Sequence, residues 1–397
     1  MGTWKTCTIG DLGEVVGGAT PSTKKAENYE GGTIPWITPK DLASFSSRFI
    51  SRGERNITKY GYKSCSTQLM PAHTVLFSSR APIGYIAIAE KELCTNQGFK
   101  SVIPNENTDY LFLYYLLKFN KDKIENLGSG TTFKEISGST MRSIEVSVPD
   151  SIEEQRQIAS VLSVLDDKIE NNIAINKNLE QQLSALFTNM FGFNIDKLDE
   201  SEFKLDDLVE SVDNRGKTPP LSDKPTSYPI IDVKALSGDI RIVDYNNCTK
   251  YVNEETYNNW FRSGHPKQYD ILVSTVGSLA EMKIFLGDVG CIAQNVVGFR
   301  SKGISPLYLY QYLNYIKNDL AAYNIGSVQP SIKVTHIIKH PIYVAPQDEL
   351  NRFDSVARSI TEQIFANCQE SEKLKQLRDT LRPKLMSGEL DVSNIDL

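Results

Sequence analysis

The sequence lacks the features that would mark a membrane or secreted protein. It has no run of 18 apolar residues, so no helix is expected to span a bilayer. Near the N-terminus Asp11 and Glu14 lie among glycines, where a signal peptide would carry a basic and then an apolar segment. The six cysteines are widely spaced and form no CxxC pair, which predicts neither a zinc site nor a disulfide framework. We therefore expect a cytoplasmic protein.

Signatures of catalysis are also scarce. Gly216-Lys217-Thr218 looks like the end of a phosphate-binding loop, but Pro219 and Pro220 forbid the helix that such a loop needs. His336 and His340 have the i, i+4 spacing of helical metal ligands, yet the residues around them read as a strand. The sequence therefore predicts no catalytic residue and no metal site.

One constellation keeps an enzymatic alternative open. Asp270, Glu281 and Lys283 fit a loose D…ExK spacing, which would make the chain a Mg-dependent nuclease. Three residues with a free gap occur by accident in many chains of this length. We treat the nuclease as an alternative only.

The composition and the charge describe a folded chain of at least two domains. With 397 residues, 40% of them hydrophobic and 23% charged, the chain exceeds what one core usually organises. The net charge of −6 argues against nucleic-acid binding when the chain is taken whole. Counted by segment, however, residues 1–150 carry +2 and 204–345 carry +1, whereas 151–203 carry −6 and 346–397 carry −3. The globular parts are therefore free to approach a phosphate backbone.

An internal duplication with a period near 196 residues is the most informative feature. Eight short matches recur in the same order in both halves. Examples are Ile9-Gly10-Asp11-Leu12 with Leu205-Asp206-Asp207-Leu208, Thr20-Pro21 with Thr218-Pro219, Gly98-Phe99 with Gly298-Phe299, and Asn126–Ser129 with Asn324–Ser327. The sequence thus predicts two similar halves.

Each half divides into a globular part and a long helix. Residues 1–150 show short β-rich runs, turns and a helix near Tyr110, which is typical of an α+β domain. From Ser151 no Gly or Pro occurs until Gly192, a plausible helix end. We expect two similar mixed α/β domains, 1–150 and 193–345, joined by two long antiparallel coiled-coil helices in 151–192 and 346–397, with pseudo-twofold duplication.

A heptad seam runs along the first helix and, less regularly, along the second. Steps of four and three residues connect its apolar positions, and asparagines interrupt it in the middle, a device that fixes the register of a coiled coil. Pro383 is expected to end or kink the second helix near Arg382. The residues predicted to pair the helices are Ile158, Leu162, Leu165, Ile169, Asn172, Asn176, Leu179, Leu183, Val356, Ile360, Ile364, Asn367, Leu374 and Leu381.

Polar loops rich in glycine and hydroxyl side chains recur at matching places in the two globular parts. Such loops let backbone N–H groups approach phosphate, while Arg, Asn and Gln can read base edges. We predict a DNA-binding role for Thr20, Ser22, Lys24, Lys25, Lys40, Ser78, Ser79, Arg80, Asn96, Gln97, Ser129, Thr131, Thr132, Lys134, Arg215, Lys217, Thr218, Lys234, Ser274, Thr275, Gln294, Asn295, Ser327, Gln329, Ser331 and Lys333.

At these loops the sequence resembles a known family. The motifs are GGATPST with IPWI, FSSRAPIG, NQGFK, GTTFKEIS, and PDSIEEQ before the long helix. They resemble the target-recognition domains and conserved spacer of type I restriction-modification specificity subunits. The resemblance covers essentially the whole chain and is looser in the second half.

The resemblance implies a DNA-binding subunit without a catalytic centre. Such a subunit reads a bipartite site on double-stranded DNA, one half per domain, with the helices as a ruler for the gap. Its implied partners are two methyltransferase subunits, which use S-adenosylmethionine, and restriction subunits, which use ATP and Mg. No cofactor is expected in this chain itself. A coiled-coil protein scaffold without a DNA role is the second alternative.

Overall fold

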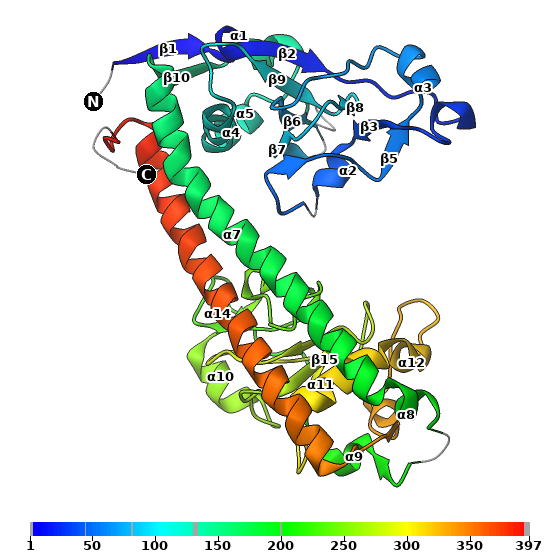
Figure 1. The fold of residues 1–397 in the computed structure, drawn as a ribbon. Helices are drawn as coiled ribbons and strands as arrows, with labels where there is room; N and C mark the ends of the chain where they lie inside the picture. Colours follow the sequence, from blue (N-terminus) through cyan, green and yellow to red (C-terminus); the bar gives the residue numbers. More distant parts are fainter. Residues whose placement is uncertain (1–2, 44, 81, 130–133, 199–200, 393–397) are drawn as a thin grey trace. The chain divides into compact units, whose positions relative to one another are not determined.

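The chain forms two compact units in a computed structural model that describes residues 3–43, 45–80, 82–129, 134–198 and 201–392. The first unit joins Met1–Asn171 to Ser371–Leu397, and the second is Asn172–Glu370. The predicted boundaries at 150, 192 and 345 divide the chain differently, because they separate the helices from the globular parts. In the structure, both long helices contribute residues to both units (Figure 1).

The first unit is built on three sheets (Figure 1). A five-stranded sheet has the order β2-β9-β6-β7-β4, formed by Gly13–Gly17, Lys100–Pro104, Val75–Ser79, Ile83–Ala89 and Phe49–Ile50. A three-stranded sheet has the order β5-β3-β8, formed by Arg55–Ile57, Ile34–Ile37 and Cys94–Thr95. An antiparallel ribbon pairs β1 (Trp4–Thr8) with β10 (Glu145–Pro149).

Short helices connect these strands. Six buried residues of α4 belong to the hydrophobic core that covers the main sheet of the first unit. The Asp109 side chain caps α4 by accepting a hydrogen bond from the Phe112 N–H, and the apolar residues of the helix pack on Phe77 and Ile88 of the sheet. The helices are α1 (Ile9–Leu12), η1 (Ala26–Asn28), α2 (Pro39–Leu42), α3 (Lys59–Lys63), α4 (Tyr110–Phe119), α5 (Lys121–Asn126) and α6 (Gly138–Arg142).

The second unit has a similar plan with a main sheet of four strands. Its main sheet has the order β12-β17-β15-β16, formed by Val209–Val212, Val296–Ser301, Ile271–Ser274 and Met282–Ile284. Two ribbons pair β11 (Phe203–Lys204) with β18 (Pro341–Ile342), and β13 (Tyr228–Pro229) with β14 (Tyr251–Val252). The helices are η2 (Thr188–Gly192), α8 (Phe193–Asp196), α9 (Leu205–Leu208), η3 (Val233–Leu236), η4 (Tyr245–Asn247), α10 (Glu254–Trp260), α11 (Pro306–Tyr315), α12 (Lys317–Ala322) and α13 (Val334–Ile337).

Backbone hydrogen bonds correct two of the sequence matches between the halves. The N–H of Ser79 donates to Gly98, and that of Thr275 donates to Asn295, so Phe99 corresponds to Val296 and the Gly298-Phe299 match was wrong. The N–H of Ser129 donates to Glu135 and that of Ile325 to Ser331, which shifts the Asn126–Ser129 match by two residues. Short matches cannot register loops that differ by one or two residues.

The helices α7 (Ile152–Phe187) and α14 (Gln347–Met386) pair antiparallel within each unit. In the first unit Ile158 and Leu162 share a core with Leu385 and Met386. In the second unit Leu183 and Phe187 share a core with Leu350, Phe353 and Ala357. Each helix therefore completes the hydrophobic core of both units.

Several details of the helices differ from the sequence prediction. Val356 is 42% exposed, so its predicted pairing role is wrong; Phe353 and Ala357 occupy the buried stripe instead, because the seam shifts by one residue there. Pro383 lies inside α14, which continues to Met386. Gly192 closes a π-helical turn that leads on into α8.

The segment around His336 is helical. The residues Val334–Ile337 form the short helix α13, where a strand was expected, and the His340 ring accepts or donates a hydrogen bond at the Tyr323 hydroxyl. Among the residues that the structure describes, no helix is both long and apolar enough to cross a membrane.

Candidate nucleic-acid interface

The predicted loops of the first unit meet at one end of the main sheet. The Thr20 hydroxyl donates to the Gln97 side chain, which lies in the turn before β9. In the same turn Asn96 accepts a hydrogen bond from the Gly98 N–H at 2.8 Å, and Gly98 in turn accepts from Ser79 at the end of β6. Arg80 follows directly in the chain. A continuous set of contacts thus links Thr20 to Arg80.

The second unit contains the same frame with different side chains. Gln294 donates to the Thr218 hydroxyl, as Gln97 pairs with Thr20 in the first unit. Thr275 donates its N–H to Asn295 and is followed by Val276, which forms a bridge with Ser331. The bridge of Arg80 with Glu135 is the corresponding contact in the first unit. The backbone is therefore shared, while Arg80 and Glu135 become Val276 and Ser331.

Charge at the interface of the first unit is largely compensated within the protein. Arg80 and Lys100 both lie close to Glu135, with N–O distances of 3.8 and 3.7 Å. Lys40 pairs with Glu54 at 2.9 Å. These pairs are at least partly exposed, so each contributes little to stability and can be exchanged for a phosphate contact.

Other predicted cations also have intramolecular partners. Arg215 of the second unit forms two side-chain hydrogen bonds with Asp213, at 2.8 and 2.7 Å. Burial raises the pKa of Asp213, but the hydrogen bonds from Arg215 outweigh it, and the net shift of that pKa is downward. Lys25 approaches Glu27 at 3.9 Å.

Four of the predicted DNA contacts are buried in the protein. The Ser78 hydroxyl donates to the Pro82 carbonyl and accepts from the Tyr85 N–H, and Ser274 does the same with Ser278 and Glu281. Both serines hold the turn between two adjacent strands. Ser79 and Thr275 are also fully buried. The prediction that Ser78, Ser79, Ser274 and Thr275 touch DNA is therefore wrong for this structure.

The remaining predicted residues lie at the surface or partly so. Half-buried are Thr20, Arg80, Asn96, Arg215, Asn295 and Ser331. Exposed are Ser22, Lys24, Lys25, Lys40, Gln97, Ser129, Lys134, Lys217, Thr218, Lys234, Gln294, Ser327, Gln329 and Lys333. Thr131 and Thr132 lie outside the described residues. The structure thus leaves these surface side chains available to a ligand.

Sequence reasoning missed two groups of residues. Lys100 and Glu135 stand in the NQGFK and GTTFKEIS motifs, which were the signal that could have found them. Arg48 and Arg241 are buried arginines that bind carboxylates of α7. Isolated arginines in loops carry no sequence signal of this kind, because their partners lie far away in the chain.

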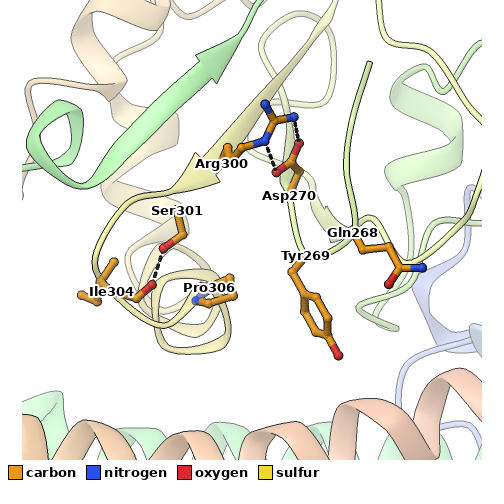
Figure 2. Close-up of a pocket in the computed structure, with 7 residues that line it drawn as sticks. All are labelled: Gln268, Tyr269, Asp270, Arg300, Ser301, Ile304 and Pro306. Carbon is orange, nitrogen blue, oxygen red and sulfur yellow. Dashed lines mark hydrogen bonds and ion pairs between the residues drawn. The ribbon is translucent and has the colours of Figure 1, made fainter. Parts of the chain in front are cut away.

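The three residues of the alternative nuclease site each bind a different partner. Figure 2 shows Asp270 facing Arg300, with hydrogen bonds of 3.1 and 2.7 Å, beside a cavity of about 160 Å³. Glu281 pairs with Lys317 at 2.9 Å. Lys283 is buried and donates to the Gly238 carbonyl at 2.6 Å and to that of Ile240. Nothing in this arrangement favours a nuclease.

Burial also changes the acid–base properties of Lys283. Loss of solvent lowers the pKa of its ammonium group to about 8. Within the described ranges, no cluster of three or more His, Cys, Asp or Glu side chains is placed to hold a metal ion.

A buried polar layer crosses the helix pair of the second unit. The Asn172 amide donates to the Asn367 carbonyl at 3.4 Å and to Glu370 at 2.8 Å. The Asn367 amide donates to Asn176 at 2.7 Å, and all three asparagines are at most 6% exposed.

The apolar residues that were predicted to pair the helices differ in burial. Five are buried: Ile158, Leu162, Ile169, Leu183 and Ile364. Another five are half-buried: Leu165, Leu179, Ile360, Leu374 and Leu381.

Comparisons with known proteins agree on one family. The family model described as "Type I restriction modification DNA specificity domain" matches the chain twice, over residues 1–181 and 198–377. The MjaIX type I specificity subunit of Methanocaldococcus jannaschii is 34% identical over 425 residues, which cover 99% of this chain and 94% of the relative. The EcoR124I/EcoR124II specificity subunit of Escherichia coli is 31% identical over 169 residues, 41% of this chain and 40% of the relative.

A solved structure extends this likeness to the fold. The S subunit of a type I restriction-modification system from M. genitalium aligns with a TM-score of 0.58 at 17% identity. The alignment covers 97% of this chain and 96% of that chain. The two molecules therefore share an architecture along nearly their entire length.

Proposed function

Because the chain belongs to the family of type I restriction-modification specificity subunits, we propose that each of its two units reads one half of a bipartite DNA site. Members of this family supply DNA sequence recognition and are not catalytic themselves; catalysis lies in partner subunits. We call the globular parts of the two units the first and the second recognition domain.

The observation that carries this proposal is the shared frame with different side chains. Both domains hold a Thr–Gln pair, Thr20 with Gln97 and Thr218 with Gln294, at the same end of the main sheet. Around that pair the first domain presents Arg80 where the second presents Val276. A guanidinium group can bind guanine through two hydrogen bonds, whereas an isopropyl group can contact a thymine methyl group. Two such domains would select two different half-sites.

The chain is also proposed to act together with specific partners. We assign to it double-stranded DNA, two methyltransferase subunits and the restriction subunits. S-adenosylmethionine, ATP and Mg would be bound by those subunits. The net charge of −6 supports this assignment, because basic partners would have to supply much of the attraction to the phosphate backbone.

The helices α7 and α14 act in this proposal as the ruler that sets the gap between the half-sites. Their antiparallel seam, with a buried asparagine layer, supports a fixed register. Removing one heptad from each helix takes away about 10 Å of helix, which corresponds to about three base pairs of DNA.

Adenine-methylation sequencing of the host genome tests the proposal directly. We expect a bipartite motif with a fixed gap, and a gap about three base pairs shorter after the double heptad deletion. Arg80→Ala should change the preference in one half-site and leave the other as it is. A continuous motif, or an unchanged gap in a deletion variant that still methylates, would contradict the proposal.

A further inference from the structure

Arg48 connects the first recognition domain to α7 through a set of buried contacts. It lies just before the edge strand β4, and its carbonyl accepts a hydrogen bond from the Ile88 N–H of the neighbouring strand β7 at 2.8 Å. Its backbone N–H and its Nε both donate to one oxygen of Glu170, at 2.7 and 3.2 Å, and a terminal nitrogen donates to the other oxygen at 3.2 Å. The same terminal nitrogen also binds Asp167. The side chain is 5% exposed.

Arg241 repeats this arrangement in the second recognition domain. Its carbonyl accepts from the Ile284 N–H of β16 at 2.7 Å. Its backbone N–H and Nε donate to one oxygen of Glu180 at 2.7 and 3.0 Å, and a terminal nitrogen donates to the other at 2.7 Å. The guanidinium also donates to the Thr361 hydroxyl of α14 at 3.0 Å and is fully buried. We call the three hydrogen bonds from the backbone N–H and the guanidinium of each arginine to one carboxylate its grip. Two unrelated loops would not form the same three hydrogen bonds by chance.

The grip departs from the internal duplication in one respect. Glu170 and Glu180 both belong to α7, although the duplication equates the first part of α7 with the first part of α14. Glu170 would then correspond to Phe365, which cannot accept a hydrogen bond. If the duplication held at this contact, the carboxylate that binds Arg241 would lie on α14, but Glu180 lies on α7. The same contact is therefore made although the helix is not the one that the duplication predicts. This is expected if the grip itself is needed in both domains.

From this geometry we infer that Arg48 and Arg241 are positioning residues that fix how each recognition domain is held on α7 and thereby how strictly the gap between the half-sites is enforced. The inference rests on the proposed function. Neither guanidinium can touch DNA, since both are buried against helices. Each is tied at one end to the main sheet and at the other to α7. A small rotation of a domain about this attachment would shift its DNA contacts along the duplex.

The test uses the complex with the methyltransferase subunits and a series of DNA duplexes. The duplexes carry the natural half-sites with the natural gap and with gaps one and two base pairs shorter or longer. The variants are Arg48→Gln and Arg241→Gln, and the controls are Arg156→Gln and Arg352→Gln. The control arginines lie on α7 and α14 in exposed ion pairs with their own helix. Methylation rates are measured for each duplex.

We expect the wild-type complex and both controls to prefer the natural gap. In Arg48→Gln and Arg241→Gln the preference over gaps changed by one base pair should fall about tenfold or more, because a displacement of 1 Å at a reacting group can cost about 100-fold in rate. The ranking of single-base changes within each half-site should stay the same. If the arginines only stabilise the fold, the amount of complex and its melting temperature will fall while the gap preference stays unchanged, and the inference is wrong.

If the arginine variants do not assemble with the methyltransferase subunits, two milder variants still test the inference. Glu170→Gln and Glu180→Gln retain an acceptor oxygen and remove one charge, so they loosen the grip without leaving a large cavity. They should weaken the gap preference in the same direction, and an unchanged preference again overturns the inference. A wild-type complex with no gap preference at all would instead refute the ruler of the proposed function, which separates the two failures.

Discussion

At the scale of single residues, Glu135 controls the charge of the first recognition domain. It lies 3.8 Å from Arg80 and 3.7 Å from Lys100, and it is 44% exposed. Partly exposed ion pairs are worth about 0.2–1 kcal/mol, so the contact is easily broken by a competing phosphate. If this surface meets DNA as proposed, Glu135 reduces its attraction for DNA of any sequence.

Glu135→Gln should raise the affinity of the subunit complex for random DNA. Two cations lose their intramolecular counter-ion, and each can add about 0.9 to the magnitude of the slope of log K against log salt. The slope should thus become steeper by up to about 2. Fluorescence anisotropy with a random duplex at several salt concentrations measures the slope. Glu54→Gln, which frees only Lys40, serves as the comparison and should steepen the slope by at most about 0.9. A slope that stays at the wild-type value would show that neither cation meets phosphate.

At the scale of secondary-structure elements, the asparagine layer determines how α7 and α14 align. Burial of an amide is unfavourable unless it is hydrogen-bonded, and the donors of Asn172 and Asn367 find acceptors in the observed register. Leucines at the same places would pack equally well after a shift by a turn. The layer therefore gives up some stability for a unique alignment.

Replacing Asn172 and Asn176 by Leu should leave both helices folded and loosen their register. Circular dichroism should show unchanged helix content and a melting temperature that is equal or higher, because apolar side chains replace buried amides. Spin labels at the exposed positions Asn178 and Glu362 report the alignment. One narrow distance distribution in the wild type should become broad or double in the variant. A distribution as narrow as that of the wild type would make the asparagines incidental.

The pKa shifts of two histidines predict that the second unit loses stability in mild acid. Burial lowers the pKa of His265, which stacks on Tyr257 with 3.7 Å between ring centroids, and burial likewise lowers the pKa of His340. Below pH about 6.5 the unfolded chain binds protons that the folded chain does not. The free energy of unfolding of the second unit therefore decreases as the pH decreases. The contribution is fully present above that pH and is lost as pH decreases through the folded values.

Urea unfolding between pH 5 and 8 checks this expectation. The midpoint of the second unit should decrease below pH about 6.5, and His265→Phe should reduce the decrease, because phenylalanine keeps the stacking and cannot be protonated. Hydrogen exchange assigns the transition to the unit. A pH dependence that is identical in wild type and His265→Phe would exclude His265 as its source.

How far these elements could be predicted depends on the range of the interactions. The long helix after Ser151 and its seam follow from local periodicity, which is why the buried positions Ile158, Leu162 and Ile169 were predicted. Val356 was misplaced because α14 buries Phe353 and Ala357, one residue away from the expected stripe. Periodicity in a less regular helix does not show which stripe faces the partner.

The sequence predicted which loops form the candidate site, but it predicted less well which side chains of those loops reach the surface. Thr20 and Gln97 lie in recognisable motifs and meet at the sheet end, whereas Ser78 and Ser274 share the same composition but point into a turn. Ser79 and Thr275, the next residues along the chain, are buried as well, so composition does not show which hydroxyl groups near a loop reach the surface. Arg48 and Arg241 bind carboxylates that lie 122 and 61 residues away in the sequence, which no local pattern reveals.

At the scale of the whole molecule, the last helix completes the first recognition domain. Leu385 and Met386, at the end of α14, are at most 1% exposed and pack in the core that contains Phe112 and Ile158. Arg378 of the same segment binds Asp166 at 2.6 Å. The first unit therefore cannot reach its full stability until the end of the chain is present, whereas Asn172–Glu370 supplies the second unit without it.

Leu385→Ala should destabilise the first unit by about 2–5 kcal/mol and leave the second unchanged, because it removes buried methyl groups and leaves a cavity in one core only. Hydrogen exchange with mass spectrometry distinguishes the units: protection should fall in β6 and α4 and persist in β15 and α11. Leu377→Ala, on the same helix but 47% exposed, is the matched control and should change neither. Equal loss of protection in both units would mean that they unfold as one cooperative body, and the C-terminal segment would then stabilise the whole chain.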